Sequence, residues 1–292
     1  MNFFPSRWPI MCAVMNSVSD LTLASAVHSA GAMPSLMIKW TAHDLLHDQL
    51  KEFVRLNGDG NCVLQLGYKD LTDSIVLSLV EQYQISHVEL FGLIGIPNHK
   101  MQAEFDTVMK QPKYLEGYQR LKNNRRILTR IFTPSSGQGI DAYALKGAES
   151  AGFGSNISVK DLFSQQQAQT PDISLIPYGG IGTPEQVAWY IKHGAAGVAV
   201  GTLFAATQES CLSFETKTAM VKASSQDLRK LNTFQQALVL GDISQDNAPN
   251  RQYSLDQGIA GHGGLVYAGT AIDHVTHIRT IQEVVDYLTS EL

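Results

Sequence analysis

The chain has 292 residues and a formal net charge of −5, with 17% charged and 44% hydrophobic residues. This mildly acidic composition argues against a general nucleic-acid or anionic-membrane surface, and the apolar runs are far too short to span a membrane. Pro5, Arg7 and Pro9 interrupt any signal-peptide core, and three scattered cysteines without a CxxC pair are typical of a reduced, cytoplasmic protein.

Apolar segments that alternate with amphipathic segments predict a repeated strand–helix pattern. The expected strands cover residues 9–15, 34–38, 62–66, 87–93, 126–132, 141–146, 174–178 and 197–200. The expected helices cover residues 20–30, 41–56, 71–83, 101–122 with a break at Pro112, 158–167, 183–193 and 212–223. Only residues 133–140 are too short and glycine-rich for a helix. This alternation indicates an α/β protein, and eight repeats favour a closed (β/α)8 TIM barrel over an open sheet.

Two of the predicted strands end in small residues. Residues 174–178 are followed by Gly179 and Gly180, and residues 197–200 are followed by Gly201 and Thr202. In (β/α)8 barrels, backbone N–H groups after the seventh and eighth strands form a phosphate site. The alternative is that the glycines serve only as turns where helices begin and end.

Residues 225–292 follow the eight predicted repeats. Within them we expect a strand or helix pair at 231–241, a polar loop at 242–257, a glycine-dense stretch at 258–270 and a final helix at 280–288. No domain boundary is evident. We therefore expect a barrel over residues 1–224 and a C-terminal extension over residues 225–292, packed on the same domain. The extension would cover the barrel mouth or take part in a subunit contact.

Short motifs follow one another along most of the predicted barrel. They are Pro9-Ile10 with Ala13-Val14-Met15, LASAVHSAG at 23–31, FG…P at 91–97, GAESAGFG at 147–154, GGIG at 179–182, GTLF at 201–204, and Thr207, Glu209, Ser210 and Lys217. None is specific alone. In this order and spacing, the chain resembles the nitronate monooxygenase family, formerly called 2-nitropropane dioxygenases, and the related FMN-dependent enoyl-ACP reductases.

The resemblance implies that FMN binds at the mouth of the barrel. The cofactor-binding residues expected on this basis are Ala13, Val14, Met15, Gly179, Gly180, Gly201 and Thr202. The glycine turns, with the Thr202 hydroxyl, would hold the phosphate, which needs converging donors. The segment 13–15 would lie along the isoalloxazine ring; its alternative role is that of simple core residues.

Two residues depart from the family pattern near the end of the sixth strand. The family's GxEAGGHxG turn carries a histidine base, but the matching position here is Phe153, whose ring cannot accept a proton. Nitronates, which are already deprotonated, would not need that base. Lys146 stands where the family commonly has a neutral residue. It would stabilise negative charge on reduced flavin or substrate, or act as an amine with a depressed pKa; its alternative is to reach solvent.

Two further residues are candidates for a replacement base. His262 lies in a GHGG segment that the resemblance places near the mouth, and its alternative is a surface loop histidine. Glu149 follows the sixth strand directly, and its alternative is a structural hydrogen bond. With Lys146 they form the expected catalytic set. His274 and His277 lack a carboxylate cluster that would complete a metal site, so no metal is expected.

The resemblance implies an FMN-dependent oxidoreductase similar to nitronate monooxygenase. Its expected partner is a small-molecule substrate, with a homodimer suggested by the family and no nucleic-acid or membrane partner. Three alternatives stay open. They are an NAD(P)H-dependent flavin reductase of an activated C=C or C=N bond, a flavin-free barrel lyase or isomerase using Lys146 on a phosphorylated ligand, and a non-catalytic FMN-binding partner subunit.

Overall fold

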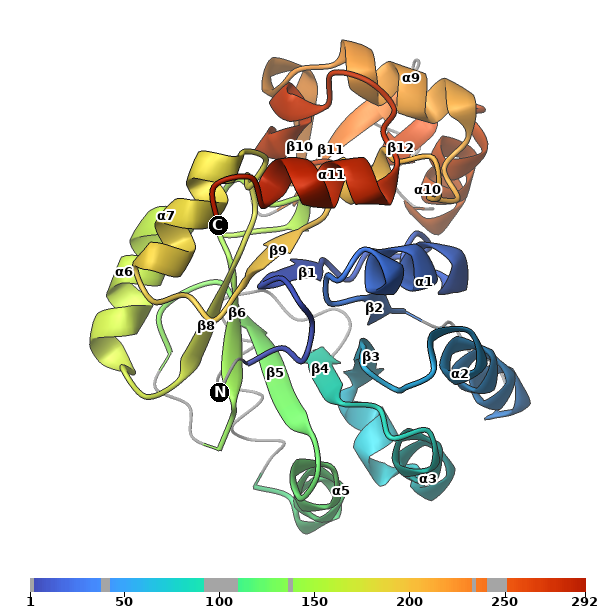
Figure 1. The fold of residues 1–292 in the computed structure, drawn as a ribbon, viewed down its shortest axis with the longest axis vertical. Coiled ribbons are helices and arrows are strands. Elements are labelled where there is room, and N and C mark those ends of the chain that lie inside the picture. The colour runs from blue at the N-terminus through green and yellow to red at the C-terminus, as the bar shows by residue number, and fades with distance from the viewer. Residues whose placement is uncertain (1–2, 38–42, 92–109, 136–138, 233–234, 241–250) are drawn as a thin grey trace.

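The computed structural model describes residues 3–37, 43–91, 110–135, 139–232, 235–240 and 251–292. Predictions for residues 38, 41–42, 92–93, 101–109, 136–138, 233–234 and 241–250 lie outside the described residues. Within the described part, parallel strands form a nearly closed barrel with helices around it (Figure 1). The prediction of a (β/α)8 barrel is confirmed.

The barrel strands run in the order β1-β9-β8-β6-β5-β4-β3-β2. They are β1 (Ile10–Cys12), β2 (Ser35–Leu36), β3 (Val63–Gly67), β4 (His87–Phe91), β5 (Arg126–Ile131), β6 (Ala142–Lys146), β8 (Ser174–Tyr178) and β9 (Val198–Val200). A parallel bridge between Met11 and Met33 joins the two ends of the sheet. Strand β1 is shorter than predicted, because after Ala13 the chain leaves the ladder with β9.

Helices follow the strands, largely as their sequence signals predict. They are α1 (Leu21–Ser29), α2 (His43–Asn57), α3 (Ser74–Gln82), α5 (Pro112–Lys122), α6 (Val159–Gln169), α7 (Pro184–Lys192), α8 (Thr202–Ala205) and α9 (Phe214–Lys222). Asp20 caps α1, and Thr183 caps α7 with Pro184 in its first turn. Gly194 follows the end of α7 at a φ of +93°, which only glycine adopts readily. The break predicted at Pro112 is the start of α5.

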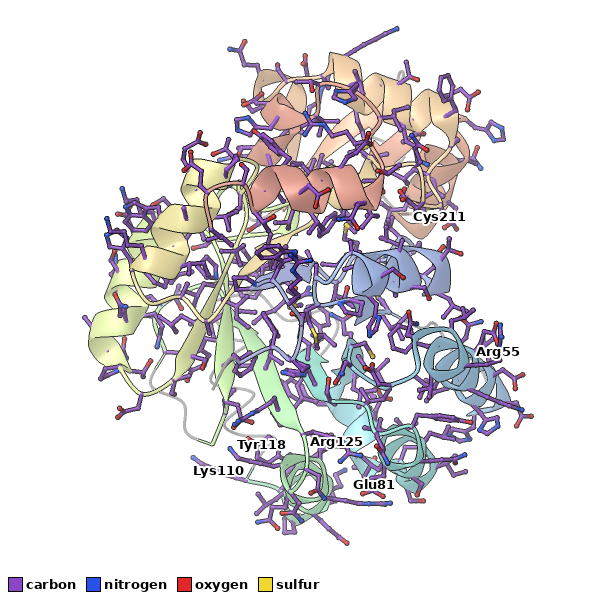
Figure 2. The ribbon with its side chains drawn as sticks, viewed as in Figure 1. Arg55, Glu81, Lys110, Tyr118, Arg125 and Cys211 are labelled. Atoms are coloured by element: carbon purple, nitrogen blue, oxygen red, sulfur yellow. The ribbon has the colours of Figure 1, made fainter. Side chains whose placement is uncertain are left out.

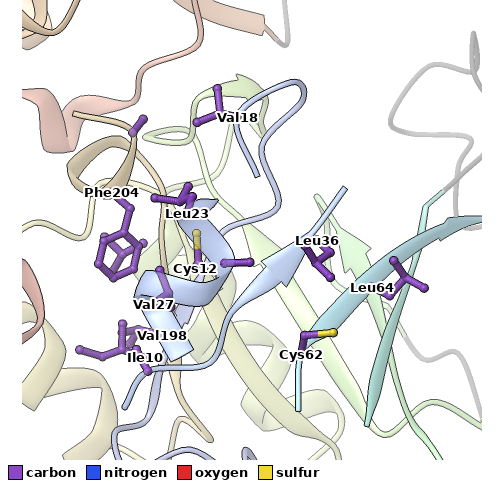
Figure 3. Close-up of a cluster of buried hydrophobic side chains, with 14 of the residues drawn as sticks. Ile10, Cys12, Val18, Leu23, Val27, Leu36, Cys62, Leu64, Val198 and Phe204 are labelled. Atoms are coloured by element: carbon purple, nitrogen blue, oxygen red, sulfur yellow. The ribbon is translucent and has the colours of Figure 1, made fainter. Parts of the chain in front are cut away.

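Alternate residues of each barrel strand face two different cores. On β1, Met11 points into the barrel, where it packs with residues of β3, β5, β6, β8 and β9. Ile10 and Cys12 point outward to a larger core between strands and helices, with Leu23 and Val27 of α1 (Figure 3). This alternation leaves the inner residues at the carboxyl ends of the strands facing the barrel mouth.

The C-terminal extension contains a second, smaller sheet. Its strands are β10 (Leu228–Asn232), β11 (Gln235–Leu240) and β12 (Gly264–Val266), and β7 (Gly152–Phe153) pairs with β11. The pair predicted at 231–241 is the antiparallel hairpin β10–β11. Residues 251–260, expected mostly as a polar loop, form helix α10 (Arg251–Ala260) instead. Leu255 of this helix packs with Leu265 of β12, so tertiary packing stabilises a helix that polar sequence does not indicate.

The final helix, α11 (Ile281–Leu288), joins the extension to the barrel. Its apolar face contributes to the same core as α1 and α7, and Figure 1 shows it lying between the extension and the barrel. The Glu209 carboxylate accepts a hydrogen bond from the Ile281 N–H at 3.0 Å, and Lys217 Nζ donates to the Ser210 carbonyl at 2.8 Å. The residue boundary at 224 stays a prediction.

The outer surface carries charged side chains, such as Arg55 on α2, Glu81 on α3 and Arg125 in the turn between α5 and β5 (Figure 2). Glu81 pairs with Arg120 at 2.6 Å, which links α3 to α5. Such exposed pairs contribute little to stability. No helix in the described part of the chain is both long and apolar enough to cross a membrane.

Candidate active site

A cavity of about 320 Å³ lies at the carboxyl ends of the barrel strands, within the size range of small-molecule sites. Barrel residues on its wall include Ala13, Val14, Met15, Gln65, Phe91, Arg130, Lys146, Tyr178, Gly179, Gly180, Gly201 and Thr202. The extension supplies Leu255, Ile259, Leu265, Val266, Tyr267, Gly269 and Ala271. The cavity therefore has a partly polar floor inside the barrel and a largely apolar outer wall.

The structure brings all seven expected cofactor-binding residues to this cavity. Gly179 and Gly180 have φ values of +115° and +69°, which turn the chain sharply after β8. A Cβ on Gly201 would come within 3.3 Å of the Ala13 Cβ, so glycine keeps open the gap between the ends of β9 and β1. Thr202 Oγ1 accepts a hydrogen bond from the Gly269 N–H at 3.0 Å, which leaves the Thr202 O–H as a donor.

A layer of polar side chains forms the floor of the cavity. Glu89, which is fully buried, accepts hydrogen bonds from Gln65 Nε2 at 2.9 Å and from the Tyr178 hydroxyl at 3.1 Å. Arg130 Nη2 lies 2.5 Å from the same carboxylate. Burial alone would lower the pKa of Arg130, but Glu89 and Tyr178 together more than offset burial and raise this pKa above the usual value. Arg130 and Glu89 therefore form a buried, charged pair.

Lys146, the last residue of β6, reaches this floor from the other side. Its side chain is buried, and its Nζ donates to the Ala151 carbonyl at 3.0 Å and lies 5.8 Å from the centre of the Tyr178 ring. Burial, and after it the positive charge of Arg130, lower the pKa of Lys146 to about 7, while Glu89 acts in the opposite direction. The amine can therefore gain or lose a proton near neutral pH.

Phe153 lies on the wall of the cavity with 40% of its surface exposed. Its backbone belongs to β7, which pairs in antiparallel register with β11, Phe153 opposite Gln235. The loop after β6 is thus hydrogen-bonded into the sheet of the extension. This places an uncharged ring, with free surface, between the barrel floor and the apolar wall.

The other two expected catalytic residues are not brought to the cavity. His262 is exposed and is not among the lining residues. Glu149 Oε2 accepts a hydrogen bond from the Val159 N–H at 2.8 Å, so its carboxylate satisfies the first turn of α6. We therefore leave both residues out of the proposed catalytic set. Among the described residues, no group of three or more His, Cys, Asp or Glu side chains could hold a metal ion.

Gln65, Glu89, Arg130 and Tyr178 are site residues that the sequence reasoning missed. A signal was present: Glu89 and Arg130 are charged residues in strands whose other positions are mostly apolar, HVELF and RILTRI. Charged side chains are almost never fully buried unless they are paired. Two opposite charges in neighbouring strands therefore could have predicted a pair inside the barrel.

The fold and the cavity define a (β/α)8 barrel protein with its binding site at the carboxyl ends of the strands. Residues 135–291, more than half of the chain, match the family model of nitronate monooxygenase. The chain belongs to the nitronate monooxygenase family, as the motifs predict. Among curated protein sequences, none matches significantly.

Solved structures with the same fold cover nearly the whole chain. FabK from Thermotoga maritima aligns with a TM-score of 0.77 and 19% identity, over 98% of this chain and 93% of its own. A nitroalkane oxidase from Streptomyces ansochromogenes aligns with a TM-score of 0.71 and 20% identity, over 98% and 96% of the two chains. The enoyl reductase domain of MlnA from Bacillus amyloliquefaciens aligns with a TM-score of 0.68 and 11% identity, over 99% and 95%.

FMN is the cofactor of this family, so the prediction of FMN is confirmed and the chain is a flavin-dependent oxidoreductase. The residues present fit that cofactor. The gap at Gly201 would be narrowed by a Cβ, and the neighbouring Thr202 offers a hydroxyl donor suited to a phosphate. The adjoining segment 13–15 gives the cavity an apolar side that a flat ring system could cover.

Proposed function

We propose that the protein oxidises small alkyl nitronates, with oxygen as the second substrate. The observation that carries this proposal is the charge of the cavity wall. In the described part of the chain, its ionisable lining residues are Arg130, Lys146, Tyr178 and Tyr267, with no histidine or carboxylate among them. Such a wall attracts an anion when Lys146 is protonated and offers no histidine or carboxylate as a general base, and a nitronate is an anion that needs no deprotonation.

In this proposal the glycine turns after β8 and β9 bind the phosphate of FMN through backbone N–H groups, assisted by the Thr202 hydroxyl. The segment 13–15 orients the ring over the polar floor. Bound FMN supplies the redox chemistry, passing an electron or a hydride between the substrate and the oxidant. The chain's own contribution is binding, orientation and charge.

Lys146 is the proposed substrate-binding cation. Among the residues that the structure describes, the Ala151 carbonyl is the one hydrogen-bond acceptor of its Nζ on the cavity wall, so further N–H donors remain for nitronate oxygens. Because the pocket is buried, an ammonium–anion contact there is stronger than in water. An incoming anion also favours the charged form of the lysine, whose pKa in the free protein is about 7.

Phe153 and the lining residues of the extension are proposed to bind the apolar part of the substrate. The exposed face of the Phe153 ring lies with Leu265 and Tyr267 on the same cavity, where an alkyl chain would displace water. Phe153 provides no proton acceptor. The protein is therefore proposed to discriminate in favour of nitronates over the neutral nitroalkanes from which they derive.

Anaerobic mixing of the FMN-loaded protein with an alkyl nitronate tests the proposal. Bleaching of the flavin absorption, with turnover when oxygen is admitted, is the expected result, and the parent nitroalkane should react far more slowly. Phe153→His should raise the nitroalkane rate relative to the nitronate rate. Reduction by neither compound would refute the proposal.

A flavin-dependent reductase of an activated C=C or C=N bond is the second candidate. It is supported by FabK and the enoyl reductase domain of MlnA, which share the fold over almost the whole chain. The apolar wall would suit a substrate with a carbon chain. Anaerobic bleaching by NADPH but not by nitronate would favour this function, and a preparation that takes up no FMN would exclude both.

A further inference from the structure

The segment that directly follows β1 and borders the cavity has an unusual set of hydrogen-bond partners. The Ala13 N–H still pairs with the Val200 carbonyl of β9, at 2.9 Å. The next peptide turns inward, and Val14 is buried. Its N–H donates to the Tyr178 hydroxyl at 3.3 Å, and its carbonyl accepts from Arg130 Nη2 at 3.3 Å. Side chains of β8 and β5, rather than a neighbouring strand, therefore satisfy both polar groups of Val14.

Both of these side chains are held by one carboxylate. Glu89 Oε2 accepts from the Tyr178 hydroxyl at 3.1 Å, and Glu89 Oε1 lies 2.5 Å from Arg130 Nη2. Gln65 Nε2 adds a third contact to Oε1 at 2.9 Å. Glu89 is fully buried, in the middle of β4 and remote in sequence from β1. One carboxylate thus orients the two groups that orient Val14.

We propose that Glu89 is a positioning residue for the flavin: through Arg130 and Tyr178 it fixes the backbone of Val14, and with it the surface on which the isoalloxazine ring lies. This inference rests on the proposed placement of FMN. It adds a buried group, which does not itself line the cavity, to the residues that are expected to contact the ring.

The geometry explains why a costly buried charge stands at this position. A neutral residue at 89 would leave the Arg130 guanidinium buried without its counter-charge, and Arg130 Nε already has no hydrogen-bond partner among the described residues. An apolar residue there would also leave Tyr178 without an acceptor for its O–H. Both side chains would then be free to rotate away from Val14. The Val14 peptide would no longer be held in one orientation at the barrel floor.

Glu89→Gln is the direct test, because glutamine keeps the shape but can present only one acceptor oxygen. Tyr178→Phe removes the hydroxyl from both Glu89 and Val14 and serves if the first variant does not fold. Thr129→Val is the matched control: it removes a buried hydrogen bond to the Leu90 carbonyl between the same two strands, without contact to Val14.

We expect Glu89→Gln and Tyr178→Phe each to raise the dissociation constant of FMN about tenfold, measured by quenching of FMN fluorescence on titration of the apoprotein. The absorption spectrum and reduction potential of the bound flavin should also shift, and the double variant should lose less affinity than the product of the two single effects. Thr129→Val should lower the unfolding temperature of the apoprotein without moving any flavin property.

Wild-type affinity, spectrum and potential in both Glu89→Gln and Tyr178→Phe would overturn the inference while leaving the FMN site intact. Equal flavin shifts in Thr129→Val would overturn it also, because a general loss of barrel packing would then account for them. Failure of the wild-type protein to bind FMN would remove the proposed function, and the inference with it.

Discussion

At the scale of single residues, the least ordinary feature of the site is a buried lysine that forms no salt bridge with any residue the structure describes. The Lys146 amine donates to a backbone carbonyl, while the Glu89 carboxylate, which favours its charged form, is held by Arg130. A buried cation in this position loses hydration without a full compensating charge, and its pKa falls accordingly. The charge of the site therefore depends on pH within the physiological range.

The fraction of Lys146 in the ammonium form falls as the pH rises through about 7. If that form binds the substrate, KM for a nitronate should rise about tenfold per pH unit above this pKa, while kcat changes little. Lys146→Met should show a high KM at every pH and no such inflection. Steady-state kinetics between pH 5.5 and 9 would check this, taking about 7 as the expected midpoint. A wild-type KM that is flat with pH would contradict the role given to Lys146.

Gly201 offers a second test at this scale. Its backbone is not in the left-handed region, so alanine can be accommodated there, but the added Cβ would approach the Ala13 Cβ to 3.3 Å and narrow the gap proposed for the phosphate. We expect Gly201→Ala to fold normally and to weaken FMN binding by about tenfold or more.

Gly67→Ala is a suitable control for Gly201→Ala. It adds the same methyl group at the end of a barrel strand, where its nearest neighbour would be an Asp70 oxygen at 3.5 Å, and Gly67 does not line the cavity. Equal FMN affinity in the Gly201→Ala variant and the wild type would argue against a phosphate in that gap.

At the scale of elements, the motif at 207–217 is explained by its contacts. The Glu209 carboxylate lies at the start of α11, where it accepts a hydrogen bond from the Ile281 N–H. Lys217 Nζ donates a hydrogen bond to the carbonyl of the neighbouring residue Ser210. These contacts attach the last helix to the barrel. The motif that helped to identify the family therefore has a structural role in this chain. It does not belong to the glycine turns that are proposed to bind the cofactor.

Glu209→Ala should consequently destabilise the protein by about 1 kcal/mol, the usual cost of losing a side-chain acceptor at a helix N-terminus. The measurement is urea unfolding followed by far-UV circular dichroism, with FMN affinity expected to change little. Glu291→Ala removes an exposed acid near the end of the chain and should have no measurable effect. Equal stability of the two variants would refute the role of Glu209.

Elements differ in how well the sequence predicts them. The barrel strands are largely buried on both sides and appear as mostly apolar runs, and Asp20, Thr183 and Gly194 mark helix ends through local chemistry that needs no distant partner. Helix α10 was missed because its stability depends on packing against β12. The link from Glu89 through Arg130 and Tyr178 to Val14 was missed because these residues come from separate strands, and the contacts with Val14 form only across the closed barrel.

At the scale of the whole molecule, the barrel and extension share a hydrophobic core through α11, and the cavity has walls from both. FMN should therefore stabilise the molecule as one unit. At a free FMN concentration about one hundred times its dissociation constant, the stabilisation expected from mass action is about 2.7 kcal/mol.

Thermal unfolding by calorimetry, with and without FMN, would measure this effect. The expected result is a single transition that moves to higher temperature with FMN concentration. A separate transition for the extension that ignores FMN would contradict a shared binding unit.

The division of the cavity wall between two stretches of chain also bears on how such a protein can change. The turns after β8 and β9 belong to the barrel, whereas Leu255, Leu265 and Tyr267 come from the extension. Substitutions in the extension can therefore reshape the space available to a substrate while the cofactor cradle keeps its geometry. One barrel can in this way serve different substrates, with selectivity and redox chemistry carried by separately variable parts of the same chain.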